Sequence, residues 1–214
     1  MKPWTLVAAA VGVAAAVATS PPVRRYCLTW GASAEEASAA LPGDDLLPVA
    51  AVQSTRAIAI GAEPWAVWPW LVQMGSGRGG AYTYDWIENL FGLDMHSADE
   101  IRPEFQKLAV GDTLPLSPDQ PPMRVEICEE NQTLVFRSAD GVWVWAFVLR
   151  ARDGGTRLIS RNRISPPDRR FFYDLLMAQG SLVMERKMLL GIRQRAEKLQ
   201  VAGLSALTRA VVSS

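Results

Sequence analysis

Cysteine and histidine are scarce in this sequence. Among 214 residues there are two cysteines, Cys27 and Cys128, and one histidine, His96. Two thiols cannot build a multi-disulfide scaffold or a four-thiolate zinc site, so both are excluded, while a single disulfide stays open. A metal site would need a carboxylate-dominated donor set around the one imidazole, which is an unusual combination. We therefore expect neither a metal nor a cofactor.

The sequence also lacks a net charge, because 22 Lys and Arg balance 22 Asp and Glu. Nucleic-acid-binding domains usually carry a basic excess, so we expect no nucleic-acid partner. The composition, 49% hydrophobic and 21% charged, is typical of a folded protein and not of a disordered chain. The length suits one domain with additional segments, and nothing in the sequence indicates the oligomeric state.

Charged residues are missing from residues 3–23. As a helix these residues would span about 31 Å, which matches the core of a bilayer. Arg24 and Arg25 follow where the lipid headgroups would lie. We therefore expect a single-pass membrane protein whose membrane partner is reached through this helix. The alternative is a signal peptide cleaved near Ala18, which would leave a secreted protein.

The rest of the chain is patterned as an α+β protein. Residues 53–60 alternate as a strand, and two short helical stretches follow, at residues 65–74 and 84–91. Beyond residue 101 the pattern changes to strands separated by turns, and residues 168–199 then carry the longest helical pattern. A curved antiparallel sheet wrapped around that helix would bury the apolar faces of both. Such an arrangement tends to leave a cavity between sheet and helix.

One short helix is predicted between the apolar segment and the first strand. Ser33 precedes residues 34–40, and Glu36 stands three positions after Ser33. This spacing indicates a capping box, in which each of the two side chains bonds the backbone N–H of the other residue. Pro42 and Gly43 end the helix.

Four stretches carry a likeness to a known superfamily. They are AVWPWLVQMGSGRGGAYTYDWIENLFGLDMHSADEI (66–101), LAVGDTL (108–114), WAFVL (145–149) and VMERKMLLGI (183–192). These stretches resemble the START-like or SRPBCC superfamily, whose helix-grip fold is shared with Bet v 1-type allergens and polyketide cyclases, and in particular its actinobacterial members. The resemblance implies the helix-grip fold, but it implies function only by analogy, because members include lipid carriers, sterol binders and enzymes. The expected segments are an apolar anchor or signal helix (1–23), a connector (24–52), a START-like helix-grip domain (53–199) and a tail (200–214).

Aromatic and methionine side chains mark the expected ligand cavity. The candidate ligand-binding residues are Tyr82, Tyr84, Trp86, Trp145, Met177, Met184 and Met188. Aromatic rings with polar tips suit a wall that orients an apolar ligand, and methionines on the last helix suit an adaptable pocket floor. Ordinary core packing explains the same residues equally well.

No catalytic centre is evident in the sequence. His96, Asp85 and Glu88 are weak candidates for acid/base work, since each side chain can move a proton near neutral pH when its surroundings shift its pKa. No Gly-x-Ser-x-Gly elbow occurs, and Cys128 has no activating base near it in the sequence. We therefore assign no catalytic residue and favour a binding protein over an enzyme.

Two further motifs have ordinary structural explanations. Residues 75–80 match the GxGxxG pattern of dinucleotide-binding loops, but that loop must follow a strand, and here it follows a helix. We expect a flexible turn, which in a helix-grip protein could gate the cavity. Arg157, Arg161 and Arg163 share one face of a predicted strand, which favours a solvated face, with contact to lipid headgroups as the alternative.

Three functional hypotheses follow. The first is a membrane-tethered domain that binds a hydrophobic small molecule, such as a lipid or a polyketide-like compound, in an internal cavity. The second is an enzyme of cyclase or dehydratase type, with an acid/base residue facing that cavity. The third is a non-catalytic interaction module.

Overall fold

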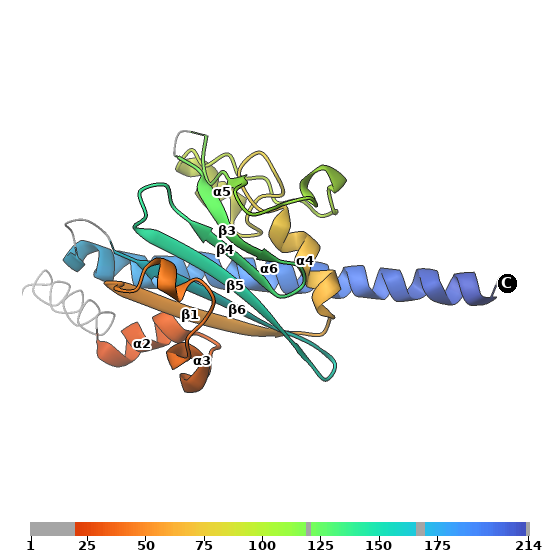
Figure 1. Ribbon diagram of the computed structural model, residues 1–214, viewed down its shortest axis with the longest axis horizontal. Helices are drawn as coiled ribbons and strands as arrows, with labels where there is room; N and C mark the ends of the chain where they lie inside the picture. Colours follow the sequence, from red (N-terminus) through yellow and green to blue (C-terminus); the bar gives the residue numbers. More distant parts are fainter. Residues whose placement is uncertain (1–19, 119–120, 166–169, 213–214) are drawn as a thin grey trace, which may run out of the picture.

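The fold is built on one antiparallel sheet. The computed structural model describes residues 20–118, 121–165 and 170–212. Within them, six strands lie in the order β1-β6-β5-β4-β3-β2 (Figure 1). The strands are β1 (Val52–Ile60), β2 (Thr113–Leu114), β3 (Met123–Glu129), β4 (Thr133–Arg137), β5 (Trp143–Arg152) and β6 (Gly155–Ile164). All neighbouring pairs are antiparallel, and the first strand pairs with the last.

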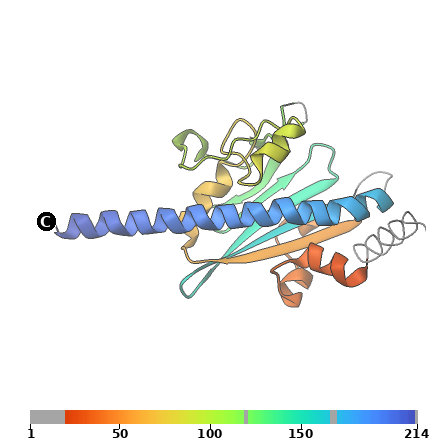
Figure 2. The same cartoon turned by 180° about the vertical axis from the view of Figure 1, so that it is seen from behind.

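Helix α6 (Arg170–Val212), 43 residues long, lies across one face of this sheet and continues beyond it at the C-terminal end (Figures 1 and 2). The buried side chains of α6 recur every three to four residues, at Met188, Leu189, Ile192 and Ala196. That spacing places them on one stripe of the helix, against the core. The predicted helix-grip class, an α+β fold with a curved antiparallel sheet around a long C-terminal helix, is therefore confirmed. The helix continues past residue 199, where the sequence had suggested a tail.

Two short helices follow β1, as predicted. They are α4 (Pro64–Val72) and α5 (Asp85–Leu90), and a single 3₁₀ turn, η2 (Pro103–Phe105), comes after them. The glycine-rich residues 75–80 form a turn after α4, closed by a bridge between Gly75 and Gly80. Both glycines have positive φ angles, of 120° and 70°, which glycine adopts without steric cost. The predicted turn after this helix is confirmed.

The connector packs on the sheet in two places: its first helix lies beside β1 and against α6, and the rest covers the second face of the sheet. It contains α2 (Pro21–Thr29), α3 (Ala34–Ser38) and the 3₁₀ turn η1 (Asp44–Leu46). The capping box is formed as predicted, because Glu36 N–H donates to Ser33 Oγ at 3.0 Å and Ser33 N–H donates to Glu36 Oε2 at 2.8 Å. At the edge of the sheet, Ala57 N–H donates to the carbonyl oxygen of Trp30 at 3.2 Å.

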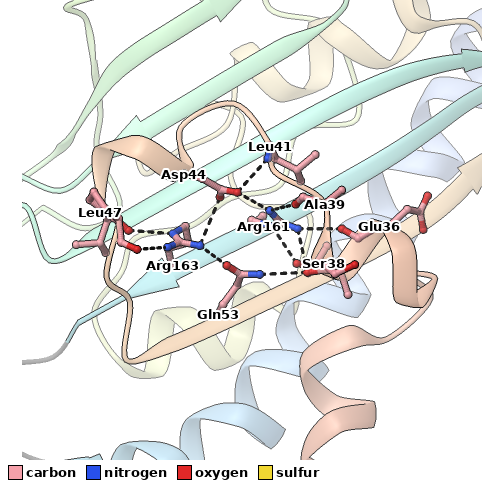
Figure 3. A network of polar contacts seen from close by, with 12 residues as sticks. Glu36, Ser38, Ala39, Leu41, Asp44, Leu47, Gln53, Arg161 and Arg163 are labelled. Atoms are coloured by element: carbon pink, nitrogen blue, oxygen red, sulfur yellow. Dashed lines mark hydrogen bonds and ion pairs between the residues drawn. The ribbon is translucent and has the colours of Figure 1, made fainter.

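The arginines of β6 hold the connector on the sheet, so the prediction of a solvated arginine face is wrong. Only 2% of the Arg161 side chain is exposed, and its guanidinium donates to Asp44 Oδ2 at 2.7 Å and to the carbonyl oxygen of Ala39 at 2.8 Å. Figure 3 shows Arg161 and Arg163 reaching from β6 into the connector backbone. Arg157 binds both carboxylate oxygens of Glu36, at 2.8 and 2.7 Å. Strand alternation alone could not reveal that another segment covers these side chains.

The expected localisation, a single-pass membrane protein, is corrected by the structure. None of the helices within residues 20–118, 121–165 and 170–212 is both long and apolar enough to cross a membrane. Helix α6 has the length, but charged residues such as Arg186, Lys187 and Arg193 interrupt it. The apolar stretch expected to form the anchor falls on residues 1–19, which lie outside the described residues.

Candidate functional site

A cavity of about 320 Å³ lies between the sheet and α6. Small-molecule sites usually measure about 300–1,000 Å³, so this cavity suits a compact ligand. Its wall comes from β1, β5, β6 and α6, and it is completed by residues around α5. The wall is mostly apolar, with a few polar side chains, which is the usual composition of a pocket that binds a small molecule.

The sheet side of the cavity is set by strand register. Ser54 of β1 pairs with Asn162 of β6, and Asn162 pairs with Trp145 of β5. Because cross-strand partners project from the same face of a sheet, all three side chains point toward α6 and into the cavity wall.

Two tryptophans form an aromatic surface on this wall. The rings of Trp143 and Trp145 are stacked, with centroids 5.8 Å apart and planes inclined by 20°. Their indole N–H groups donate to Asn162 Oδ1 at 2.9 Å and to Ser160 Oγ at 3.0 Å. Both polar tips are therefore satisfied by β6, and the tryptophans contribute carbon surface to the cavity.

A buried ion pair lies at the cavity wall between β1 and α6. Arg56 is fully buried and pairs with Glu185 of α6, and Arg56 also donates to Ser181 Oγ at 2.9 Å. Its Nε donates to the carbonyl oxygen of Cys27 at 3.0 Å. Glu185 in turn accepts a bond from Asn162 Nδ2 at 3.3 Å. Because a buried charge is tolerated only when it is paired and hydrogen-bonded, this network fixes the position of α6 on β1.

The α5 side of the wall carries one further ionisable side chain, Glu88, which is 7% exposed. Its Oε2 atom is buried, and the hydroxyl of Thr83 is its polar neighbour. Burial raises the pKa of the Glu88 carboxyl, the Thr83 hydroxyl opposes this effect, and the charge of Asp85 adds to it. Leaving a buried polar atom without a partner costs about 1–3 kcal/mol.

Three of the predicted ligand-binding residues lie on the cavity wall: Trp145, Met184 and Met188. Met184 and Met188 project from α6 one turn apart, so both reach the same side of the cavity. Met177 belongs to a part of α6 whose side chains lie outside the described residues.

The other predicted ligand-binding residues lie outside the wall of this cavity. Tyr82 is 1% exposed and donates its hydroxyl to the carbonyl oxygen of Trp70 at 2.9 Å, with the guanidinium of Arg195 over its ring. Trp86 is 70% exposed. Tyr84 is partly exposed, with Lys187 Nζ at 5.6 Å from its ring centroid. None of these three side chains lines the cavity, so their contact with a ligand is still only a prediction.

Of the three weak catalytic candidates, only Glu88 is part of the cavity wall. The His96 side chain is 73% exposed and lies 3.2 Å from Asp94. Asp85 accepts bonds from the backbone N–H and the hydroxyl of Ser97, at 2.8 and 2.6 Å, and so fixes the loop after α5.

Neither cysteine is arranged as a nucleophile. Cys27 and Cys128 are both free, so the single disulfide that the sequence left open is not formed. Burial raises the pKa of the Cys128 thiol, and the charges of Asp112 and Glu130 act in the same direction. The reactive thiolate form of Cys128 is therefore disfavoured.

Sequence reasoning missed most of the polar side chains of the site, namely Ser54, Arg56, Asn162, Ser181 and Glu185. One signal was present. Arg56 shares a strand face with Ile58 and Ile60, so a charged residue stands on an otherwise apolar face. A charge in that position requires a buried partner, which would have directed attention to the acidic residues of the last helix.

Comparison with known proteins gives structural matches only. No family model matches the chain, and no curated protein matches it. Protein MLL2253 from Mesorhizobium loti is 19% identical, with a TM-score of 0.43, and the match covers 69% of this chain and 98% of that one. The Polyketide_cyc-like protein Cgl2372 from Corynebacterium glutamicum is 17% identical, with a TM-score of 0.35, over 72% and 93% of the two chains. The Aha1 dimer from Colwellia psychrerythraea is 16% identical, with a TM-score of 0.43, over 68% and 96%.

These matches include a Polyketide_cyc-like structure and an Aha1 structure. A likeness to actinobacterial members in particular is not shown. With every TM-score quoted above below 0.5, the matches carry no argument about ligand or activity. Such an argument has to come from the cavity itself.

Proposed function

We propose that this protein binds a hydrophobic small molecule in the cavity between the sheet and α6. The observation that carries the proposal is a mostly apolar cavity of about 320 Å³ between the sheet and α6. A pocket of this size and mostly apolar lining is typical of small-molecule sites. Transfer of about 200 Å² of apolar ligand surface from water would contribute about 5 kcal/mol before the costs of binding are counted.

Two measurements on the full chain test this proposal. Native mass spectrometry of protein purified gently from its own host is expected to reveal a stoichiometric apolar adduct, which extraction would then identify. Titration of the protein with Nile red, a neutral apolar dye, is expected to give saturable fluorescence enhancement. A protein that carries no adduct and does not bind Nile red would contradict the proposal.

A second candidate function, an enzyme of cyclase or dehydratase type, is favoured by one observation: Glu88 faces the cavity and has a raised pKa. A carboxyl group of this kind can act as a general acid. Turnover of the extracted ligand that is lost in Glu88→Gln, with ligand affinity retained, would support an enzyme. Binding without turnover would support a carrier. The interaction module stays a prediction.

A further inference from the structure

The charges on the cavity wall do not balance. Among the residues that the structure describes, three ionisable side chains line the cavity: Arg56, Glu185 and Glu88. Arg56 and Glu185 form an ion pair and neutralise each other. None of the ion pairs found within the described residues includes Glu88. With Glu88 ionised, the described part of the wall therefore carries one negative charge that no described side chain compensates by an ion pair.

Glu88 is a buried residue of the cavity wall. Its side chain is more than nine-tenths buried, and its Oε2 atom has no hydrogen-bond partner among the described residues. Buried polar atoms in native proteins are normally hydrogen-bonded, so this carboxyl offers a place for a polar group of a ligand. Because a carboxylate oxygen only accepts hydrogen bonds, that polar group must be a donor.

The rest of the wall favours a cationic donor. The stacked rings of Trp143 and Trp145 present aromatic surface to the cavity, and indole rings attract cations. The thioethers of Met184 and Met188 are polarisable. An anionic ligand would be repelled by Glu88, and the guanidinium that could attract it is already bonded to Glu185.

We propose that the ligand is an apolar amine whose ammonium group pairs with Glu88, while its hydrocarbon part packs against the tryptophans and methionines of the wall. This inference rests on the proposed function, because it names the chemical class of the molecule in that same cavity. Burial disfavours the charged form of Glu88 and so raises its pKa, and a bound ammonium group would act in the opposite direction.

Three ligands with one carbon skeleton test the inference: phenylbutylamine, phenylbutanol and phenylbutyrate. They are titrated against the full chain by calorimetry at neutral pH, with Nile red binding measured in parallel. Phenylbutylamine is expected to bind about tenfold more tightly than phenylbutanol, because a charge-assisted bond to a buried carboxylate is stronger than a neutral one. Phenylbutyrate is expected to bind most weakly.

The variant Glu88→Gln identifies the group responsible. It is expected to reduce the preference for amine over alcohol to about twofold or less, and Nile red titration of the same variant reports whether the cavity is still formed. Glu130→Gln, which removes an exposed carboxylate, is the matched control and should keep the preference. If Glu88→Gln does not fold, the comparison of the three ligands in the unmodified protein still decides.

The outcomes separate this inference from the function on which it rests. Equal affinity for amine and alcohol, or tighter binding of the carboxylate, overturns the amine assignment while Nile red binding supports the cavity. An amine preference that survives in Glu88→Gln overturns the role of Glu88. Failure of Nile red and all three ligands to bind overturns both proposals.

Discussion

Arg161 Nη1 lies 2.7 Å from Asp44 Oδ2, and this ion pair joins the last strand of the sheet to the connector. The same guanidinium donates to the backbone oxygens of Glu36 and Ala39, at 2.9 and 2.8 Å. One side chain thus satisfies acceptors on both α3 and the chain around η1. The connector is therefore part of the folded unit that contains the cavity.

Removing this arginine should destabilise the whole fold. Arg161→Met removes the closest ion-pair partner of Asp44 and the donor to backbone oxygens of Glu36 and Ala39, and breaking one partner of a buried ion pair typically costs about 3–5 kcal/mol. Urea unfolding followed by circular dichroism measures the change. Arg150→Met, at an exposed position of the same sheet, is the control and should change the free energy of unfolding by less than about 0.5 kcal/mol. Equal effects of the two substitutions would contradict the assigned role.

A pH-dependent loss of stability is expected from Glu36. Its hydrogen bond with Arg157 lowers the pKa of this carboxyl from 4.5 to about 2. Because the folded state then binds the proton less readily than the unfolded state, the contribution is complete above the unfolded pKa and disappears as the pH falls toward the folded one. The stability difference between the unmodified protein and Glu36→Gln should shrink by about 1–3 kcal/mol between about pH 5 and pH 2. A difference that does not change with pH would show that the pair contributes nothing.

The ion pair in the cavity wall should behave as a unit. Glu185→Leu alone leaves Arg56 buried without its carboxylate and should destabilise the protein by about 3–5 kcal/mol. The double variant Arg56→Met with Glu185→Leu should recover most of that loss, because two apolar side chains of similar size need no partner. Thermal and urea unfolding of both variants provide the measurement. Additive destabilisation in the double variant would contradict this view.

Filling the cavity should abolish binding without unfolding the protein. Ala81 contributes to the cavity wall, and the ring in Ala81→Phe can occupy the space beside it. Nile red affinity is expected to fall by about tenfold or more, since the ring excludes the dye, while the unfolding free energy changes by less than about 3 kcal/mol. Ala151→Phe adds the same ring at an exposed position of β5 and serves as the control. Unchanged dye binding in Ala81→Phe would place the dye elsewhere on the protein.

The sequence predicts the fold well where a residue pattern has one interpretation. Alternation in residues 53–60, the turns beyond residue 101 and the period of the last helix all correspond to elements in the structure. Ser33 and Glu36 predict a capping box that the structure contains, because such a box depends only on local spacing.

The candidate site was only partly predictable, because burial depends on segments distant in sequence. Met184 and Met188 follow from helix periodicity, and Trp145 from the alternation of its strand. The position of the Tyr82 side chain could not be predicted from the sequence. Its φ angle of 59° is unusual for a residue other than glycine, and its ring packs away from the cavity, which no sequence pattern indicates.

The position of the connector has one more consequence, for the behaviour of β1 toward other molecules. An edge strand with free N–H and C=O groups is a template on which a second chain can assemble, and β1 is an edge strand of this sheet. Trp30 occupies part of that template by accepting the bond from Ala57 N–H. The connector therefore protects part of this edge from pairing with another chain. Proteolytic removal of the connector should expose β1 to intermolecular β-sheet formation.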